Sequence, residues 1–234
     1  ADMLARVRTL VQLKQSASRL LNAEIAMLRA QIKPHFLYNA INTIIWMSKR
    51  DIEQTRQLLR SLSDFLRGSF DFGDRESDSV VTMERELQLV KAYLSLEQAR
   101  FGERLQVEYE LETTDFLLPP LLIQPLVENA VRHGIMEKEE GGTIRIAVRE
   151  FGADLEIEIA DDGVGIPEEE IKRWSETSEI SSRGRGTGIG LNNVNRRLIR
   201  QYGQALSIRR RPGGGTVVTM RLIRMGRRDQ DEEM

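Results

Sequence analysis

The chain has 234 residues, of which 40% are hydrophobic, so it is long enough to bury a sizeable core in one or two domains. Its 34 basic and 36 acidic side chains give a net charge of -2, which excludes a global field that draws the chain to nucleic acid or anionic lipid. Cysteine is absent, which excludes disulfides and thiolate metal sites and fits a reducing compartment, so we expect the chain as given to be cytoplasmic.

The N-terminal part is predicted to be one long helix. From Leu10 to the region of Ile45, apolar residues recur every three or four positions, which indicates a helix of about 40 residues with a coiled-coil-like seam. No apolar run approaches the roughly 18 residues of a membrane span. Because the helical pattern is already under way at Ala1, we expect the chain to be a fragment of a longer protein.

A second helix is predicted after a polar break at residues 49–51. Its sequence, "DIEQTRQLLRSLSDFLRGSF", carries apolar residues on one face, so the two helices should form an antiparallel hairpin. A hairpin alone has too little core, and a second copy of the chain is expected to complete a four-helix bundle. The loop-like stretch "DFGDRESDS" places a domain boundary near residue 76. The expected parts are 1–75 (signalling helix and hairpin), 76–226 (second domain) and 227–234 (a frayed tail).

The second domain is predicted to mix helices and strands. A helix should run from about Met83 to Phe101, with Thr82 as its N-cap, and another should follow Pro119 and Pro120. Strand patterns with alternating polarity lie at residues 105–111, 143–150, 155–160, 205–211 and 216–223. A further helix, rich in glycine at its start, should end at residue 203. Because strands and helices do not alternate regularly, the expected fold class is an α+β layer sandwich.

Three motifs in this domain suggest a nucleotide site. "ADDGVGIP" ends a strand, where glycines let the backbone approach a ligand and a carboxylate can accept a hydrogen bond from an amine such as that of adenine. "GRGTGIGL" opens a helix with exposed backbone N–H groups, which suit phosphate. "VENAVRHG" combines oxygen ligands for magnesium with basic side chains for phosphate. Taken singly, each also fits a plainer explanation: an acidic turn, a linker or a solvated helix face.

The order of these motifs, closed by "PGGGT", resembles the GHKL ATP-binding fold, an α/β sandwich also called the Bergerat fold, over about residues 82–224. The resemblance implies that Asn129 holds magnesium and that Asp161 accepts a hydrogen bond from the adenine amine. It also implies that Arg132 and His133 contact phosphates. The residues that would shape the adenine end or border the triphosphate are Gly163, Gly165, Gly186, Thr187, Gly188 and Gly190.

Two further features follow from this resemblance. Commoner histidine kinases have a second asparagine four positions before the one that matches Asn129, but here Pro125 stands there. Glu128 is therefore the candidate to supply the missing oxygen or to polarise a nucleophile. The polar, serine-rich span at residues 168–185 would be the ATP lid.

The N-terminal helix indicates what receives the phosphoryl group. "QIKPHFLYNAIN", "YLSLEQARFGERL" and "PPLLIQPLVENAVRHG" resemble the LytS/YesM type of sensor histidine kinase from about residue 22 onward. The resemblance implies a homodimer in which His35 is autophosphorylated with Mg-ATP and passes the phosphoryl group to an Asp of a response regulator. It also implies that the full-length protein is anchored in the cell inner membrane upstream of residue 1 and faces the cytoplasm. A largely neutral imidazole has a ring lone pair that can attack the γ-phosphorus.

The neighbours of His35 are unusual. Many histidine kinases carry an acidic residue directly after the histidine, whereas this chain has Phe36. Gln31 and Asn39, four residues before and after, share the helix face of His35 and are candidates to orient its ring. Pro34 removes a helical hydrogen bond at a cost of roughly 3 kcal/mol, which predicts a kink that presents His35 to the ATP domain.

Two alternatives remain open from the sequence. A GHKL ATPase that cycles without a phosphoenzyme would turn over ATP but would not label itself. A dimeric adaptor with a degenerate site would not bind ATP, and the presence of Asn129, Asp161 and the glycine motifs counts against it.

Asn39 is the candidate for the reverse, phosphatase direction, because it can position a water next to phosphorylated His35 or its partner regulator. Asn39→Ala should slow the removal of the phosphoryl group from the regulator, measured against the regulator's own dephosphorylation. Removal as fast as by the unaltered protein would disprove this role.

Overall fold

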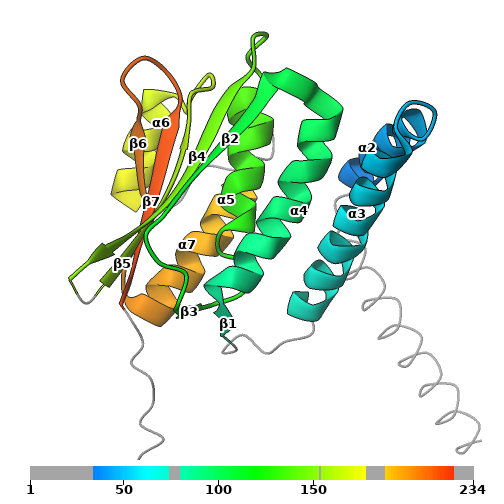
Figure 1. Ribbon diagram of the computed structural model, residues 1–234. Helices are drawn as coiled ribbons and strands as arrows, with labels where there is room; N and C mark the ends of the chain where they lie inside the picture. The colour runs from blue at the N-terminus through cyan, green and yellow to red at the C-terminus, as the bar shows by residue number, and fades with distance from the viewer. Residues whose placement is uncertain (1–33, 74–79, 153, 178–187, 224–234) are drawn as a thin grey trace, which may run out of the picture.

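The computed structural model describes residues 34–73, 80–152, 154–177 and 188–223 (Figure 1). The helices are α2 (Pro34–Met47), α3 (Ile52–Gly73), α4 (Met83–Phe101), α5 (Gln124–Asn129), α6 (Glu168–Thr177) and α7 (Gly188–Tyr202), with a 3-10 turn η1 (Gly102–Arg104) and a π-helix η2 (Ala130–Ile135). The strands are β1 (Val81–Thr82), β2 (Leu105–Leu111), β3 (Leu117–Leu118), β4 (Gly142–Phe151), β5 (Asp154–Asp161), β6 (Ser207–Arg210) and β7 (Thr216–Ile223).

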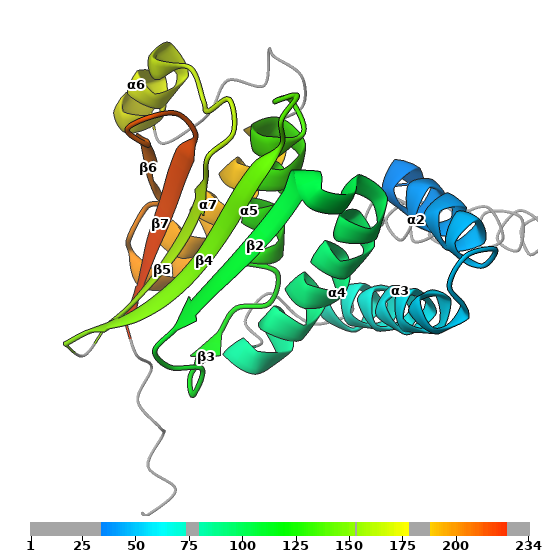
Figure 2. The same ribbon diagram turned by 45° about the horizontal axis from the view of Figure 1, so that its top comes forward.

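Five of these strands form one mixed sheet in the order β2, β4, β5, β7, β6. Strand β2 runs parallel to β4, and the other neighbours are antiparallel. Helices α4, α5 and α7 cover one face of the sheet, and α6 lies beside β6 (Figure 2). Strands β1 and β3 form a separate short ladder. The predicted α+β layer sandwich is confirmed.

The two faces of the sheet differ as the alternation of the sequence predicts. In β4, Ile144 and Ile146 are fully buried, whereas Arg145 between them lies on the other face and donates to Glu158 of β5 at 2.6 Å. Glu158 also accepts from Arg209 of β6 at 3.1 Å. One face is therefore the apolar core under the helices, and the other is covered by ion pairs.

Helix α4 begins and ends where the sequence predicts. The side-chain oxygen of Thr82 accepts a hydrogen bond from the backbone N–H of Arg85 at 3.3 Å, which caps the first turn. At the other end, Gly102 has a φ of 60° and stops the helix, because this left-handed backbone conformation suits a residue without Cβ. The predicted strand at Leu105–Leu111 follows directly and is confirmed as β2.

Helix α5 begins three residues later than the sequence suggests. We expected helix directly after Pro120, but Leu121 has a φ of 58°, and the helix starts at Gln124. The intervening turn is held by the fully buried carboxylate of Glu86, which accepts backbone N–H bonds from Leu121 and from Ile123. The prediction was wrong here because a side chain from a distant helix satisfies these N–H groups in place of a helical turn.

Helices α2 and α3 form the predicted hairpin. The connection between them is short, and the Asp51 side chain accepts from the backbone N–H of Gln54 at 2.9 Å at the start of α3. Pro34 is the first described residue of α2, so the predicted long helix before it, and the kink, lie outside the described residues. The domain boundary near residue 76 and the tail at 227–234 lie outside them as well.

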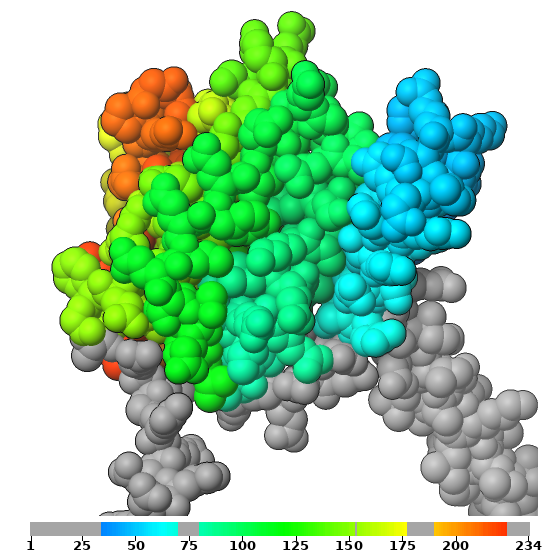
Figure 3. All heavy atoms as spheres, viewed as in Figure 1, coloured from blue at the N-terminus to red at the C-terminus, as the bar shows by residue number. Residues whose placement is uncertain are grey.

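The hairpin packs against α4 of the second domain. The ring of Phe36 lies 4.8 Å from that of Phe65 on α3 and 5.1 Å from that of Tyr93 on α4. The space-filling view shows the atoms of the hairpin directly against those of α4 (Figure 3). Part of the apolar face that we expected a second copy to cover is thus covered by the same chain.

Other large apolar side chains of the hairpin remain exposed: Tyr38, Ile41, Ile45, Trp46, Ile52 and Leu59. Among the described residues, no helix has the length and apolar content to cross a membrane.

The burial of Glu86 makes stability depend on pH. Desolvation raises the pKa of Glu86 to about 7, although backbone N–H groups of residues 121–123 and Arg197 oppose this shift. The raised pKa means that the folded state binds this proton more tightly than the unfolded state does. The associated stability is present below about pH 4.5 and is lost as the pH rises to about 7.

Glu86→Gln should therefore flatten the pH dependence of the free energy of unfolding between pH 5 and pH 7.5, by roughly 3 kcal/mol. Urea unfolding at the two pH values measures this difference. Glu84→Gln, an exposed change on the same helix, is the control. An unchanged slope in the Glu86 variant would contradict the assignment.

Candidate nucleotide site

A pocket of about 360 Å³ opens between the α5–η2 helix and the ends of strands β5 and β7. Asn129 and His133 line it from the helix, Asp161 from the end of β5, and Gly165 from the turn that follows. Apolar side chains complete the wall, including Leu126, Ile159, Val164, Leu191 and Val218. A largely apolar pocket with a few convergent polar groups is the usual form of a small-molecule site.

Asp161 is the buried acid of this pocket. Its Oδ1 accepts a hydrogen bond from the backbone N–H of Gly163 at 3.0 Å. Burial raises the pKa of Asp161 to about 6, although the bonds from the backbone of Gly163 and Thr216 lower it in part. At pH 7 the carboxyl group is still mostly ionised, so it acts as an acceptor for a ligand donor.

Backbone segments approach one another closely around Asp161. A Cβ on Gly163 would lie 2.1 Å from the carbonyl carbon of Gly134, which no real contact allows. A Cβ on Gly215 would lie 2.0 Å from the backbone oxygen of Asp161, and this glycine also has a φ of 92°. These two glycines are therefore required by packing, because only residues without Cβ let the η2, β5 and β7 backbones meet at the pocket.

Asn129 has a buried side-chain atom without a partner in the described part of the chain. Its Nδ2 atom is buried and has no hydrogen-bond partner among the described residues. A Cβ on Gly190, in the first turn of α7, would lie 3.5 Å from this atom. A buried amide without a partner is costly and fits a polar ligand or a metal, since the amide can turn either its oxygen or its nitrogen to it.

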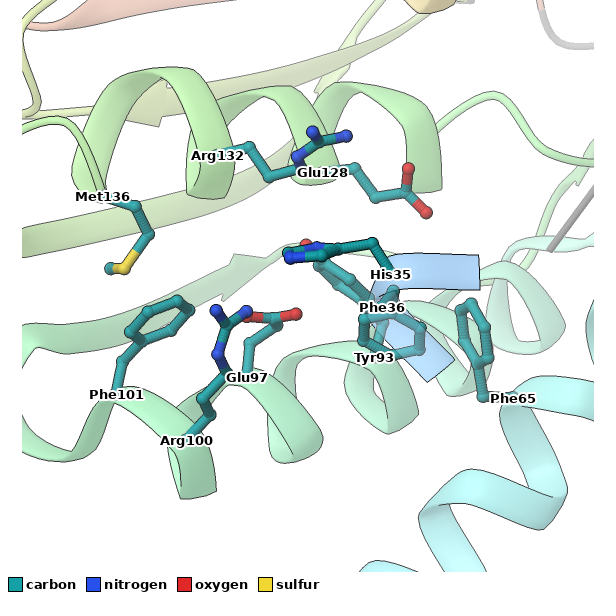
Figure 4. Close-up of a pocket in the computed structure, with 10 residues that line it drawn as sticks. All are labelled: His35, Phe36, Phe65, Tyr93, Glu97, Arg100, Phe101, Glu128, Arg132 and Met136. Carbon is teal, nitrogen blue, oxygen red and sulfur yellow. The ribbon is translucent and has the colours of Figure 1, made fainter. Parts of the chain in front are cut away.

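A second pocket, of about 180 Å³, lies against a neighbouring face of the α5–η2 helix (Figure 4). It is lined by His35 from α2, by Glu97 and Arg100 from α4, and by Glu128 and Arg132 from α5–η2. Figure 4 shows the His35 ring between the side chains of α5–η2 and those of α4.

Hydrogen bonds orient two residues of this second pocket. The side-chain amide of Asn39 lies 3.1 Å from Nδ1 of His35, as their spacing of four residues predicts. Gln124 donates from Nε2 to Oε1 of Glu128 at 2.8 Å. Glu97 is paired with Arg100 at 3.6 Å, and burial raises the pKa of the Glu97 carboxyl group.

The structure thus places the residues that the sequence singles out in two separate pockets. Asn129, His133, Asp161 and Gly165 lie together in the first pocket, with Gly163 packed behind it. His35, Glu128 and Arg132 line the second pocket, and Asn39 contacts His35 there. We expected Arg132 beside the nucleotide phosphates, but it points away from the pocket of Asn129 because it lies one residue before His133 on the helix. Gly188 begins α7, and residues 186 and 187 lie outside the described residues.

Sequence reasoning missed Tyr93, Glu97 and Arg100 as site residues. Their spacing of four and three residues can be read from the sequence, and it places them on one face of α4. No local signal showed that this face meets His35, because the contact joins helices far apart in the chain.

The segment predicted to be the ATP lid, residues 168–185, starts too early in the chain. Residues 168–177 form helix α6, and the indole N–H of the buried Trp174 donates to the carbonyl of Leu206 at 3.0 Å. This helix is therefore fixed to the segment before β6. Residues 178–187 lie outside the described residues.

The fold and the first pocket define a nucleotide-binding module of the GHKL class. A family model described as "Histidine kinase-, DNA gyrase B-, and HSP90-like ATPase" matches residues 117–225, and one described as "Histidine kinase" matches residues 23–105. The chain belongs to the histidine kinase family.

The relatives of the chain include several that are named sensor protein LytS. The protein YwpD of Bacillus subtilis strain 168 is 40% identical over 94% of this chain and 77% of its own length. Sensor protein LytS of Bacillus anthracis is 41% identical over 85% of this chain and 33% of its own length. LytS of Enterococcus faecalis is 40% identical over 77% of this chain and 30% of its own length. The chain therefore spans about a third of these LytS proteins.

Among solved structures, the histidine kinase domain of the Erythrobacter litoralis EL346 blue-light activated histidine kinase is similar, with a TM-score of 0.47 and 18% identity. The alignment covers 89% of this chain and 94% of that one.

The glycine packing leads to a test of stability. Gly163→Ala should destabilise the fold by at least about 2 kcal/mol, because the added methyl group meets backbone atoms that cannot rotate away. Urea unfolding measures the loss. Gly190→Ala is the matched control, since its Cβ would make ordinary contacts and gain helix propensity. Equal stability of the two variants would show that the backbones are not in close contact.

Proposed function

We propose that this chain is the catalytic core of a sensor histidine kinase that binds Mg-ATP, phosphorylates His35 and passes the phosphoryl group to an Asp of a response regulator. The observation that carries the proposal is the pocket in which the buried Asp161 and the unpartnered Asn129 lie together. Family membership supports the histidine kinase activity, and the finer steps are argued from the residues.

The pocket carries groups that suit both ends of the nucleotide, the adenine base and the phosphates. The ionised Asp161 would accept a hydrogen bond from the exocyclic amine of adenine, and the apolar walls at Ile159 and Val164 would cover the flat base. Asn129 and His133 would face the phosphates from the α5–η2 helix. The oxygen of Asn129 would hold magnesium, which when bound neutralises phosphate charge.

His35 is suited to act as the nucleophile. Its side chain is exposed on α2, and the Asn39 amide beside Nδ1 can turn its oxygen to accept from Nδ1–H, which leaves the Nε2 lone pair free. Nε2 would attack the γ-phosphorus while the bond to the bridging oxygen of ADP breaks. The ring proton is then lost to a base. Glu128, oriented by Gln124, is the candidate for this base.

Phe36 stands where many histidine kinases have an acidic residue, and its role here is in packing. Its ring is buried between Phe65 and Tyr93, where it attaches α2 to α3 and α4. Carboxylates reach the His35 pocket from other helices instead, namely Glu97 from α4 and Glu128 from α5.

The hairpin surface supports a homodimer. Its exposed apolar side chains include Ile41, Ile45 and Trp46 on α2 and Ile52 and Leu59 on α3. A second copy of the hairpin would bury them in a four-helix bundle. An anchor in the cell inner membrane, upstream of residue 1, and a response regulator as the partner remain part of this proposal, which the likeness to LytS supports.

The proposal is tested by incubating the chain with labelled ATP and magnesium and mapping the label. His35→Gln should lose the acid-labile label but keep its nucleotide affinity within about twofold, because His35 lies outside the nucleotide pocket. Asp161→Asn should weaken nucleotide binding by about 10- to 100-fold, because an acceptor with full charge is lost.

The same experiment separates the alternatives. ATP turnover without any label would indicate a GHKL ATPase that forms no phosphoenzyme. Absence of magnesium-dependent ATP binding would indicate an adaptor.

A further inference from the structure

Two arginine side chains meet at the His35 pocket from different helices. Arg100 lies in the last turn of α4 and Arg132 lies in η2, and both line the pocket together with His35. Figure 4 shows the nitrogen atoms of the His35 ring directed into the space between the two guanidinium groups. Since His35 belongs to α2, three separate helices bring one imidazole and two guanidinium groups to the same cavity.

The guanidinium group of Arg100 is held from two sides. Its Cζ atom lies 4.4 Å from the centre of the Phe101 ring, and its Nη1 atom lies 3.6 Å from Oε2 of Glu97. The separation from Glu97 is longer than the roughly 2.7–2.9 Å of a charge-assisted hydrogen bond. Among the described residues, neither the guanidinium group of Arg100 nor that of Arg132 donates a hydrogen bond. The Arg100 fork is therefore oriented, and its N–H groups can still be used by an anion.

Arg132 belongs to the same group of charges as Arg100. Burial raises the pKa of the Glu97 carboxyl group, and both arginines oppose this shift. Burial also raises the pKa of the Tyr93 hydroxyl well above its usual range, and Glu97 and Glu128 raise it further, whereas the two arginines lower it. Two cations and two carboxylates thus lie within electrostatic range of this one hydroxyl group, and their formal charges cancel.

A phosphoryl group on the imidazole would change this balance. Such a group carries roughly 1.5 to 2 negative charges near pH 7 and three acceptor oxygens. On Nε2 of His35 it would extend from the ring into the pocket that Arg100 and Arg132 line. A guanidinium fork can donate to two phosphoryl oxygens at once, and such pairs are among the strong hydrogen bonds of proteins. The carboxylate of Glu97 is a weaker competitor for Arg100, because burial disfavours its charged form.

We propose that this pocket holds the phosphoryl group of phosphorylated His35, with Arg100 as the main donor and Arg132 as the second. Arg100 thereby shifts the equilibrium of transfer from ATP toward the phosphorylated protein. Because Arg100 does not line the nucleotide pocket, this contribution is separate from the binding of ATP. The inference rests on the proposed function, in which His35 is the residue that is phosphorylated.

The pocket can be tested without the kinase reaction. Phosphoramidate transfers its phosphoryl group to an imidazole nitrogen and releases ammonia, and the chain has two histidines. In a His133→Gln background, the product carries the phosphoryl group on His35 alone. The phosphorus NMR signal, followed against pH, gives the pKa of this group. Arg100→Gln should raise this pKa by at least about 0.5, because a nearby cation that favours the dianion is lost.

The equilibrium of the kinase reaction gives a second measurement. At a fixed ratio of ATP to ADP, Arg100→Gln should lower the equilibrium constant for phosphorylation of His35 by about tenfold, because a charged donor to the product is lost. Arg100→Lys should restore only part of it, since lysine supplies the charge without the fork. The affinities for ATP and ADP should stay within about twofold in both variants, because Arg100 lies outside the nucleotide pocket.

Arg56→Gln is the matched control. It breaks the same kind of pair, with Glu53 three residues earlier at 3.3 Å, on the exposed surface of α3. Both the pKa of the phosphoryl group and the equilibrium constant should be unchanged in this variant, because Arg56 does not line the His35 pocket.

Glu97→Gln tests the contact in the opposite direction. It removes the competing carboxylate, so the pKa of the phosphoryl group should fall and the equilibrium constant should rise at least about twofold. Arg100→Gln and Glu97→Gln break the same ion pair, and a merely structural role of that pair would change both quantities in the same direction.

The outcomes separate this inference from the proposed function. Changes of the same sign in the two variants, or no change in Arg100→Gln, would overturn the phosphoryl site and leave the kinase activity intact. If the NMR differences were present but ATP gave no label on His35, the site would be supported and the proposed function would be wrong.

Discussion

The position of both pockets depends on one buried carboxylate. Glu86 of α4 accepts the backbone N–H bonds of Leu121 and Ile123, and so fixes the turn from which α5 starts. Arg197 of α7 holds the same turn through the carbonyl of Pro120. Because this turn decides where α5 begins, it also decides which residues of α5–η2 face each side. Burial raises the pKa of the Glu86 carboxyl group, which shows that the arrangement has an electrostatic cost.

The α5–η2 helix then carries two sets of functional groups on adjacent faces. Asn129 and His133 belong to the nucleotide pocket, and Glu128 and Arg132 to the pocket of His35. Such a helix can couple the two sites, because a movement of its backbone changes both at once. The glycine contact of Gly163 with Gly134 ties the end of this helix to the strand that bears Asp161.

The hairpin has two apolar surfaces. One surface, around Phe36 and Phe65, packs on Tyr93 of the same chain. The other, around Ile45 and Trp46, is exposed and suits a second copy. In the proposed kinase, the first surface would attach the hairpin to the second domain, and the second surface would form the dimer.

Local patterns in the sequence determined α4, β2 and the alternation of β4 and β5, because capping, glycine stops and period-two polarity act between near neighbours. The order of the nucleotide motifs likewise indicated Asn129 and Asp161, which the fold brings into one pocket. The tertiary structure decided the start of α5, the placement of Arg132 beside His35 and the part played by Glu97. Each of these depends on a contact between segments far apart in the chain, such as that of Glu86 with Ile123. No local pattern encodes which distant side chain will satisfy a given backbone group or face a given helix.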